Sequence, residues 1–217
     1  MPKTHGSVIT VGVTGASGAV YARAVLRLLA ADRRVERVFL VASEAGLRLI
    51  ATELGIVATD AKKLPAALLS APTEKLEYLP NRDIGASIAS GSAVPDAMAI
   101  VPCSAGALGS IASGIADDLI TRAADVCLKE RRPLVLCLRE TPLNRIHLEN
   151  MLRVHDAGAT VMPAMPAFYY APKTIDDMVE QFAARVLAQI GLEQERQYRW
   201  TGRGPKKYSK SATGDSR

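Results

Sequence analysis

The sequence predicts a three-layer α/β domain built on a parallel sheet. Short apolar runs, many of them β-branched, alternate along the chain with longer segments of helical period. The apolar runs are continuous, as in Ala97–Cys103, and strands of this kind are covered on both faces. Repeated alternation of strand and helix then places helices on both sides of one sheet.

The elements follow from these two patterns and from end signals. Strands are expected at Val8–Val13, Val38–Ala42, Ala97–Cys103 and Leu134–Leu138, with a short one at Thr160–Pro163. Helices are expected at Gly18–Ala31, Glu44–Leu54, Ala105–Ser113, Leu119–Glu130, Pro142–Ala157 and Thr174–Ile190. Residues 55–80 carry a weaker pattern that fits a helix over Lys62–Leu69 and a strand over Leu76–Leu79.

Two of these helices have a recognisable start. Thr174, with Asp177 three residues on, resembles a capping box. Thr141-Pro142 predicts another start, with Thr as the cap and Pro as the first helical residue.

Chain length and charge distribution limit the number of domains and the classes of binding partner. A chain of 217 residues suits one domain, which we place at residues 1–200. Seven Lys or Arg and two Asp or Glu lie between Glu195 and Arg217, so this end carries the whole net charge of +5. We expect residues 201–217 to be a disordered basic tail, and a tail of this kind does not indicate a nucleic-acid-binding fold.

Cysteines and apolar runs bear on the compartment. Cys103, Cys127 and Cys137 are odd in number and widely spaced in apolar stretches, so reduced core thiols in a cytoplasmic protein are expected. Gly12, Gly15 and nearby polar residues interrupt the first apolar run, which argues against a signal peptide. No run of 18 apolar residues exists, so no membrane span is expected.

A glycine-rich turn, Gly12-Val13-Thr14-Gly15-Ala16-Ser17-Gly18, joins the first strand to the first helix. In α/β sheets such a turn often cradles phosphate, because glycines let the backbone approach the anion and the helix start supplies free N–H groups. Thr14 breaks the dinucleotide pattern, and Ser43 stands where an acidic ribose ligand would be, so the turn suits a mononucleotide. A tight turn without a ligand is the alternative.

Two later turns repeat this composition. Ser104-Ala105-Gly106-Ala107 follows a buried strand, and Ser104 can also be a simple helix cap. Ser90-Gly91-Ser92 could offer N–H groups to a phosphate.

Charged residues complete the candidate site. Arg139 and Glu140 directly follow an apolar strand, at the edge where ligands bind. The Lys129–Arg132 run is by default a solvated face. Arg185 lies within an apolar helical face and is expected to need an anionic partner. The scattered histidines and the missing G-x-S-x-G motif argue against a zinc site or a hydrolase.

In combination, these motifs resemble the UbiX/Pad flavin prenyltransferases over roughly residues 8–200. The motifs that carry the resemblance are Thr14–Ala19, Ser90–Ser92, Pro102–Ser104, Arg122–Val126, Lys129–Leu134, Arg139-Glu140 and Phe168-Tyr169. The resemblance implies a flavodoxin-like Rossmann fold, a homododecamer with sites at subunit interfaces, and transfer of a dimethylallyl group from dimethylallyl phosphate to N5 and C6 of reduced FMN. It implies that the prenylated FMN serves a UbiD-type decarboxylase, often in ubiquinone synthesis or aromatic-acid breakdown.

The resemblance also assigns residues. It implies that FMN is held by Gly15, Ala16, Ser17, Ser43, Ser104, Ala105, Gly106, Ala107 and Arg139. It places Ser90, Gly91, Arg122, Lys129, Tyr169 and Arg185 around the prenyl phosphate. Ser17, Glu53, Lys129 and Glu140 are the expected catalytic residues, without a metal.

Two other functions stay open. A flavin-dependent cysteine decarboxylase of the phosphopantothenoylcysteine type would share fold and cofactor, but its early catalytic His and Asn-rich loop are not evident. A flavin-carrying protein without catalysis would also fit the cofactor turns, although it has no use for a second phosphate site.

Overall fold

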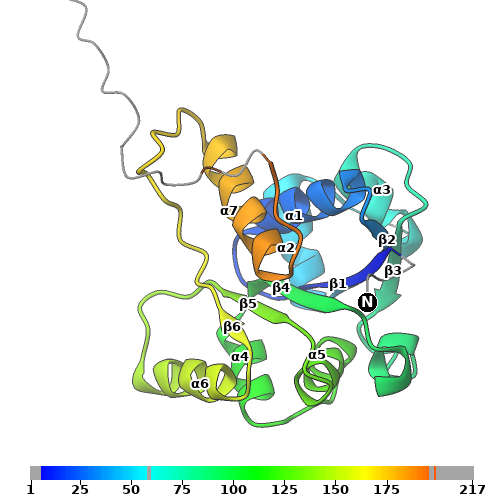
Figure 1. Ribbon diagram of the computed structural model, residues 1–217, viewed down its shortest axis with the longest axis vertical. Helices are drawn as coiled ribbons and strands as arrows, with labels where there is room; N and C mark the ends of the chain where they lie inside the picture. The colour runs from blue at the N-terminus through cyan, green and yellow to red at the C-terminus, as the bar shows by residue number, and fades with distance from the viewer. Residues whose placement is uncertain (1–5, 58–59, 196–197, 199–217) are drawn as a thin grey trace, which may run out of the picture.

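The computed structural model describes residues 6–57, 60–195 and 198. Its centre is a six-stranded sheet of order β3-β2-β1-β4-β5-β6, in which every neighbouring pair is parallel (Figure 1). The strands are β1 Ser7–Val13, β2 Val35–Ala42, β3 Leu76–Pro80, β4 Ala97–Cys103, β5 Leu134–Leu138 and β6 Thr160–Val161. The predicted parallel α/β sheet is confirmed.

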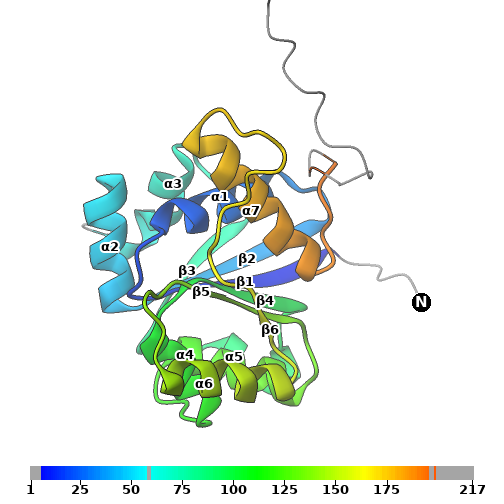
Figure 2. The ribbon, with the colours of Figure 1, turned by 90° about the vertical axis from the view of Figure 1, so that its left-hand side faces the viewer.

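Helices cover both faces of the sheet (Figure 2). One layer holds α1 (Ala19–Ala31), α2 (Glu44–Leu54), α3 (Leu64–Leu69) and α7 (Ile175–Gln189). The other layer holds α4 (Ala105–Ala112), α5 (Leu119–Lys129) and α6 (Arg145–Asp156). The molecule is therefore the three-layer domain that the sequence predicted.

Alternate residues of the central strands enter the two cores. In β4, Ala97, Ala99 and Val101 join the core beneath α1 and α7. Met98 and Ile100 join the core beneath α4 and α5. A strand with both faces buried shows the unbroken apolar run that the sequence contains.

One predicted helix start is confirmed and one is wrong. The Thr174 hydroxyl accepts the N–H of Asp177 at 3.0 Å and caps α7. Helix α6 begins at Arg145 rather than at Pro142, because the Asn144 side chain accepts the N–H of His147 at 2.9 Å. Asn144 therefore takes the capping role expected of Thr141.

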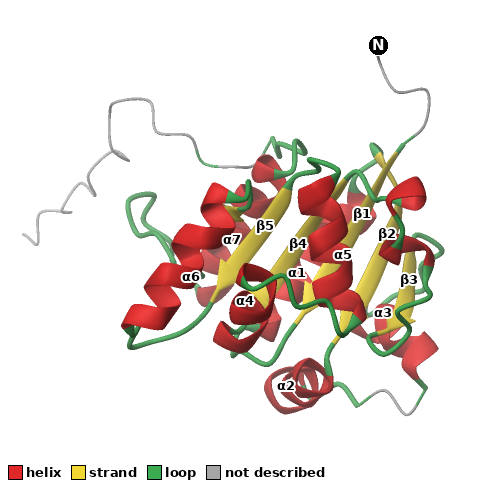
Figure 3. Cartoon of the chain, turned by 90° about the horizontal axis from the view of Figure 1, so that it is seen from below, coloured by secondary structure: helices red, strands yellow, loops and turns green. Residues whose placement is uncertain are grey.

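The strand order reverses its direction of growth between β1 and β4, and open α/β sheets generally bind ligands at such a point. The chain leaves β1 toward β2 and β3 but leaves β4 toward β5 and β6, so the connections diverge at this point. Figure 3 shows the strands side by side with α5 crossing one face and α2 beyond the edge where the strands end.

The remaining expectations concern membrane-spanning helices and the C-terminal residues. Within the described residues, no helix is long and apolar enough to cross a membrane. The predicted disorder of residues 201–217 lies outside the described residues.

Candidate active site

One buried hydroxyl joins the turn after β1 to the end of β4. The Thr14 hydroxyl donates to the Pro102 carbonyl at 2.9 Å and accepts the N–H of Ser104 at 2.7 Å. The sequence marked Thr14 only as a departure from the glycine pattern. Its bridging role was missed because Pro102 lies 88 positions further along the chain.

We expect Thr14→Val to lower the free energy of unfolding by about 1–3 kcal/mol, because valine keeps the shape but leaves the Ser104 N–H without its acceptor. Urea unfolding followed by circular dichroism measures the change. Thr52→Val is the matched control, since the exposed Thr52 hydroxyl donates to the Arg48 carbonyl within α2, and it should shift stability by less than about 0.5 kcal/mol. Equal shifts for both variants would contradict the bridge.

The carboxyl edge at β1 and β4 offers free backbone donors. Across residues 6–57, 60–195 and 198, the N–H groups of Gly15, Ser17, Ala105 and Gly106 have no protein acceptor. Gly15 also has no room for a side chain, because a Cβ there would lie 2.6 Å from the Cβ of Ala45. Free donors beside a close backbone approach suit a phosphate or the polar edge of a flavin.

Glu53 occupies part of the place expected for an anionic ligand. Its carboxylate accepts the N–H of Gly18 at 3.0 Å and that of Ala19 at 2.7 Å. The expectation that the start of α1 presents free N–H groups is therefore wrong for these two residues. A carboxylate is stabilised there by the positive end of the helix dipole. Glu53 thus contacts the turn residue that follows Ser17, and the catalytic roles of both residues stay predictions.

Three further predicted residues lie at the same edge. Arg139 donates its backbone N–H to the Cys103 carbonyl at 3.0 Å and its Nε to the Ser17 carbonyl at 3.2 Å. Ser43 donates its N–H to the Val13 carbonyl at 3.0 Å. The Ser104 hydroxyl accepts the N–H of Ala107 at 3.2 Å, so it caps α4 as predicted. The residues assigned to the cofactor thus meet at the ends of β1, β2, β4 and β5.

Glu140 follows Arg139 at this edge. It is exposed, and its carboxylate accepts the N–H of Thr141 at 3.0 Å. The side chain therefore stands in solvent in the isolated protomer, next to the cation that contacts Ser17.

Four residues expected around the substrate gather along α5. We call Ser90, Gly91, Arg122 and Lys129 the α5 cluster. A Cβ on Gly91 would lie 2.6 Å from the Lys129 Nζ, so the glycine lets the ammonium approach the backbone. Arg122 donates its Nε to the Ala89 carbonyl at 3.1 Å, just before Ser90.

The α5 cluster and Arg139 do not meet within one protomer. Lys129 precedes β5 and Arg139 follows it, and a five-residue strand spans roughly 15 Å. The Lys129 Nζ pairs with the Glu130 carboxylate at 2.5 Å. Glu140, which follows Arg139, therefore does not reach Lys129 of its own protomer.

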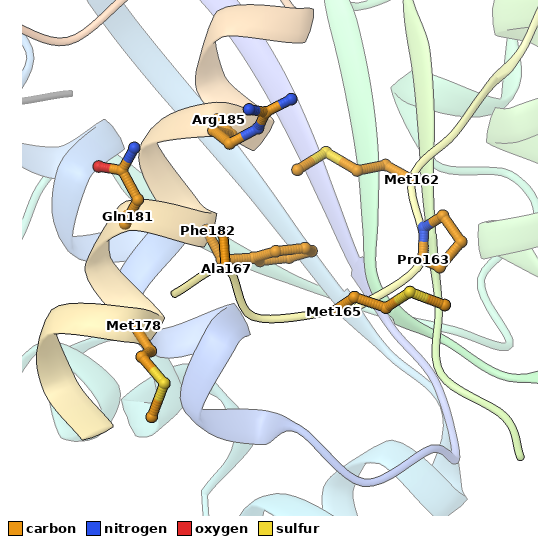
Figure 4. Close-up of a pocket in the computed structure, with 8 residues that line it drawn as sticks. All are labelled: Met162, Pro163, Met165, Ala167, Met178, Gln181, Phe182 and Arg185. Carbon is orange, nitrogen blue, oxygen red and sulfur yellow. The ribbon is translucent and has the colours of Figure 1, made fainter. Parts of the chain in front are cut away.

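Arg185 and Tyr169 form a second pair of expected substrate ligands. The Arg185 Nη1 lies 3.4 Å from the Tyr169 hydroxyl. Val186 and Phe182 are buried as the helical stripe predicted, but Arg185 itself is exposed. The expectation that Arg185 is buried is therefore wrong for the protomer, and its anionic partner stays a prediction. Figure 4 shows it beside an apolar pocket that Met162, Met165 and Phe182 also line.

The cysteines are buried and free, as expected. Burial raises the pKa of Cys103 and of Cys127 to about 12 and raises the pKa of Cys137 as well. Thiols of this kind stay protonated near neutral pH and are poor nucleophiles. Among the described residues, no group of three or more His, Cys, Asp or Glu side chains could hold a metal ion.

Comparison with known proteins identifies the family. The model of the Flavoprotein family matches residues 2–187. The flavin prenyltransferase UbiX of Halalkalibacterium halodurans is 44% identical over 193 residues, which cover 89% of this chain and 93% of the relative. The chain belongs to the UbiX family of flavin prenyltransferases. The resemblance found in the sequence is confirmed.

Solved UbiX structures share the fold of this family member. AnUbiX, solved in complex with FMN and dimethylallyl pyrophosphate, has a TM-score of 0.79 and 40% identity, with coverage of 91% of this chain and 99% of AnUbiX. A dodecameric FMN-dependent UbiX-like decarboxylase from Escherichia coli has a TM-score of 0.80 and 43% identity, with coverage of 90% and 100%.

The cysteine-decarboxylase alternative has weaker support. A PPC decarboxylase mutant is 19% identical with a TM-score of 0.54, which is a likeness of fold alone. Fold without site residues does not transfer a function.

Proposed function

We propose that this UbiX family member transfers a dimethylallyl group from dimethylallyl phosphate to N5 and C6 of reduced FMN. The proposal rests on free N–H donors and Arg139 meeting at one sheet edge, in a chain 40% identical to AnUbiX, which was solved with FMN and a prenyl pyrophosphate. The close approach at Gly15 and the neutral donors around it fit a flavin mononucleotide.

The proposed FMN ligands are the turn Gly15, Ala16 and Ser17, then Ser43, Ser104–Ala107 and Arg139. When bound, reduced FMN supplies the two nucleophilic ring atoms. The chain contributes orientation, because N–H groups bind phosphate oxygens directionally and Arg139, held on the Ser17 carbonyl, adds positive charge.

The prenyl phosphate needs fixed cations and little water. Cleavage of its C–O bond leaves the electron pair on phosphate and an allylic cation, which fixed charges stabilise and water would trap. Arg122, Lys129 and Arg185 are the proposed phosphate ligands, with Ser90, Gly91 and Tyr169. A C–N bond then forms between the prenyl group and flavin N5, and a C–C bond forms between the prenyl group and flavin C6. The proton displaced from N5 is transferred toward the phosphate, and the proton displaced from C6 is transferred to the prenyl chain.

Two carboxylates are proposed to support the reaction, one by transferring protons and one by holding the turn. Glu140, exposed at the end of β5, is the proposed relay between the flavin edge and the leaving phosphate. Glu53 holds the N–H groups of Gly18 and Ala19, which keeps the Ser17 turn in place. Lys129 neutralises the leaving group.

The proposed FMN ligands and the α5 cluster proposed for the prenyl phosphate lie in two separate regions, so a complete site needs two copies of the chain. Lys129 and Arg139 lie at opposite ends of β5. Helix α6 also exposes Ile146, Leu148 and Leu152 at 53–65%, and such side chains on one helix favour self-association. A UbiX-like relative from Escherichia coli is dodecameric, and we propose a homododecamer here.

We expect activity to be restored by mixing two inactive variants from different halves of this site. Lys129→Ala and Arg139→Ala should each be nearly inactive, whereas co-expressed mixed oligomers should recover about a quarter of the sites, by random pairing of native halves. Turnover of purified, doubly tagged oligomers measures this. The control mixes Lys129→Ala with Arg122→Ala, which share one half and should recover nothing. No recovery in the first mixture would contradict a site shared between copies.

We further propose a UbiD-type decarboxylase as acceptor of the product and the cytoplasm as location. Three buried, unpaired cysteines are compatible with a reducing compartment. The chemistry requires an acceptor enzyme, because a prenylated flavin is useful only to an enzyme that uses it as a cofactor, and the UbiD type is what the family resemblance implies.

Mass spectrometry of the flavin tests the function. Protein is incubated anaerobically with reduced FMN and dimethylallyl phosphate, and in a parallel sample with the diphosphate. We expect saturable, non-covalent FMN binding by fluorescence quenching and a flavin heavier by one isoprene unit. Bound but unchanged flavin in both samples would indicate a carrier, and oxidative decarboxylation of a cysteine substrate would indicate the other enzyme class. Either result would overturn the proposal.

A further inference from the structure

Tyr198, the last residue that the structure describes, is held by a buried amide. Gln181 of α7 is only 8% exposed. Its Nε2 donates to the Tyr198 carbonyl at 3.3 Å, and its Oε1 accepts the Tyr198 N–H at 3.1 Å. Both ends of a buried side chain are thus used to fix one backbone position.

The Tyr198 ring completes a cluster of three tyrosines. Its centroid lies 5.5 Å from that of Tyr169 and 5.9 Å from that of Tyr170. Tyr169 and Tyr170 lie 5.8 Å apart, nearly perpendicular at 79°. The Tyr170 hydroxyl donates to the Asp177 carbonyl at 3.3 Å, which ties the cluster to α7.

One member of this cluster is a proposed phosphate ligand. Tyr169 is 41% exposed, and its hydroxyl lies 3.4 Å from the Arg185 Nη1. Its ring contacts two others, and one of these belongs to the C-terminal segment. Without the Tyr198 ring, the Tyr169 side chain would lose one of the surfaces that restrict its rotamers.

We propose that Tyr198, anchored by Gln181, is a positioning residue that holds Tyr169 and Arg185 ready for the prenyl phosphate. The inference rests on the proposed function and adds Tyr198 to the residues that shape its binding site. A preordered ligand pair binds phosphate more tightly, because less side-chain freedom is lost on binding. The residues proposed to bind FMN are a different set, so FMN affinity is expected not to depend on Tyr198.

The experiment measures binding without turnover. The full chain is loaded with oxidised FMN and titrated calorimetrically with dimethylallyl phosphate. Tyr198→Ala should weaken binding about three- to tenfold, the value of one aromatic contact. Gln181→Met, which keeps the volume but loses both hydrogen bonds, should weaken binding in the same direction. Tyr198→Phe keeps the ring and should bind within roughly twofold of the parent.

The matched control is deletion of residues 203–217. This change removes most of the basic C-terminal segment but keeps Tyr198, so prenyl-phosphate affinity, oligomer size and turnover should equal those of the parent. In turnover assays with reduced FMN, Tyr198→Ala should raise KM more than it lowers kcat.

Several results would overturn the inference. These are parental affinity in Tyr198→Ala, an equal loss in Tyr198→Phe, and a parallel loss of FMN affinity, which would indicate a general structural role. Absence of prenyl-phosphate binding by the parent would overturn the proposed function as well, so the two failures are distinguishable.

Discussion

Glu140→Gln should slow prenyl transfer at saturating substrate by about 10²–10⁴-fold and change the half-saturating concentration little. A carboxylate next to a phosphate dianion does not help binding, so its presence is explained by movement of a proton. Glutamine keeps the shape and can still accept the Thr141 N–H, so the end of β5 keeps its structure. The carboxylate charge and the ability to carry a proton are lost.

Anaerobic single-turnover kinetics separates these effects. Glu36→Gln, an exposed carboxylate in β2, is the control and should leave the rate unchanged. Full rate at saturating substrate in Glu140→Gln, with only the half-saturation altered, would mean that Glu140 has no role in the chemical step.

Arg185→Ala should weaken prenyl-phosphate binding tenfold to a hundredfold and spare FMN. A hydrogen bond to a charged group contributes about 1.5–3 kcal/mol, which gives this range. Because Arg185 is exposed in the protomer, its removal leaves no buried cavity, and stability should change by less than about 0.5 kcal/mol. The loss is therefore one of ligand charge rather than of fold.

Calorimetric titration of the FMN-loaded variants measures this loss. Arg185→Lys should recover part of the affinity, since it keeps the charge but not the planar fork. The control is Arg33→Ala, which removes another exposed cation. An unchanged affinity in Arg185→Ala, or the same loss in Arg33→Ala, would exclude Arg185 as a specific phosphate ligand.

Local sequence was sufficient for most of the fold. The strand Ala97–Cys103 and the helix Glu44–Leu54 have the bounds that the sequence predicted. Both are recognisable because burial on two faces, or on one helical stripe, leaves a pattern in neighbouring residues. The Thr174 cap was predictable for the same reason, since its partner Asp177 lies three residues away.

Where local signals compete, sequence alone did not decide. Thr141-Pro142 and Asn144 both offer a helix start, and the reciprocal contact of Asn144 with His147 prevails. Arg185 sits between buried positions of α7, but the rotation of the helix against α1 turns it to solvent. Such outcomes depend on how a whole helix packs rather than on its own residues.

The sequence by itself determined the parallel sheet, the glycine-rich turn and the family of this protein. Only the tertiary structure decided that Glu53 contacts the start of α1, that Thr14 joins β1 to β4, and that Tyr198 lies on Tyr169. It also separated Lys129 from Arg139 along β5. The reason is physical: each of these relations joins groups from different elements, and packing of the layers, which no local pattern encodes, sets the distances between them.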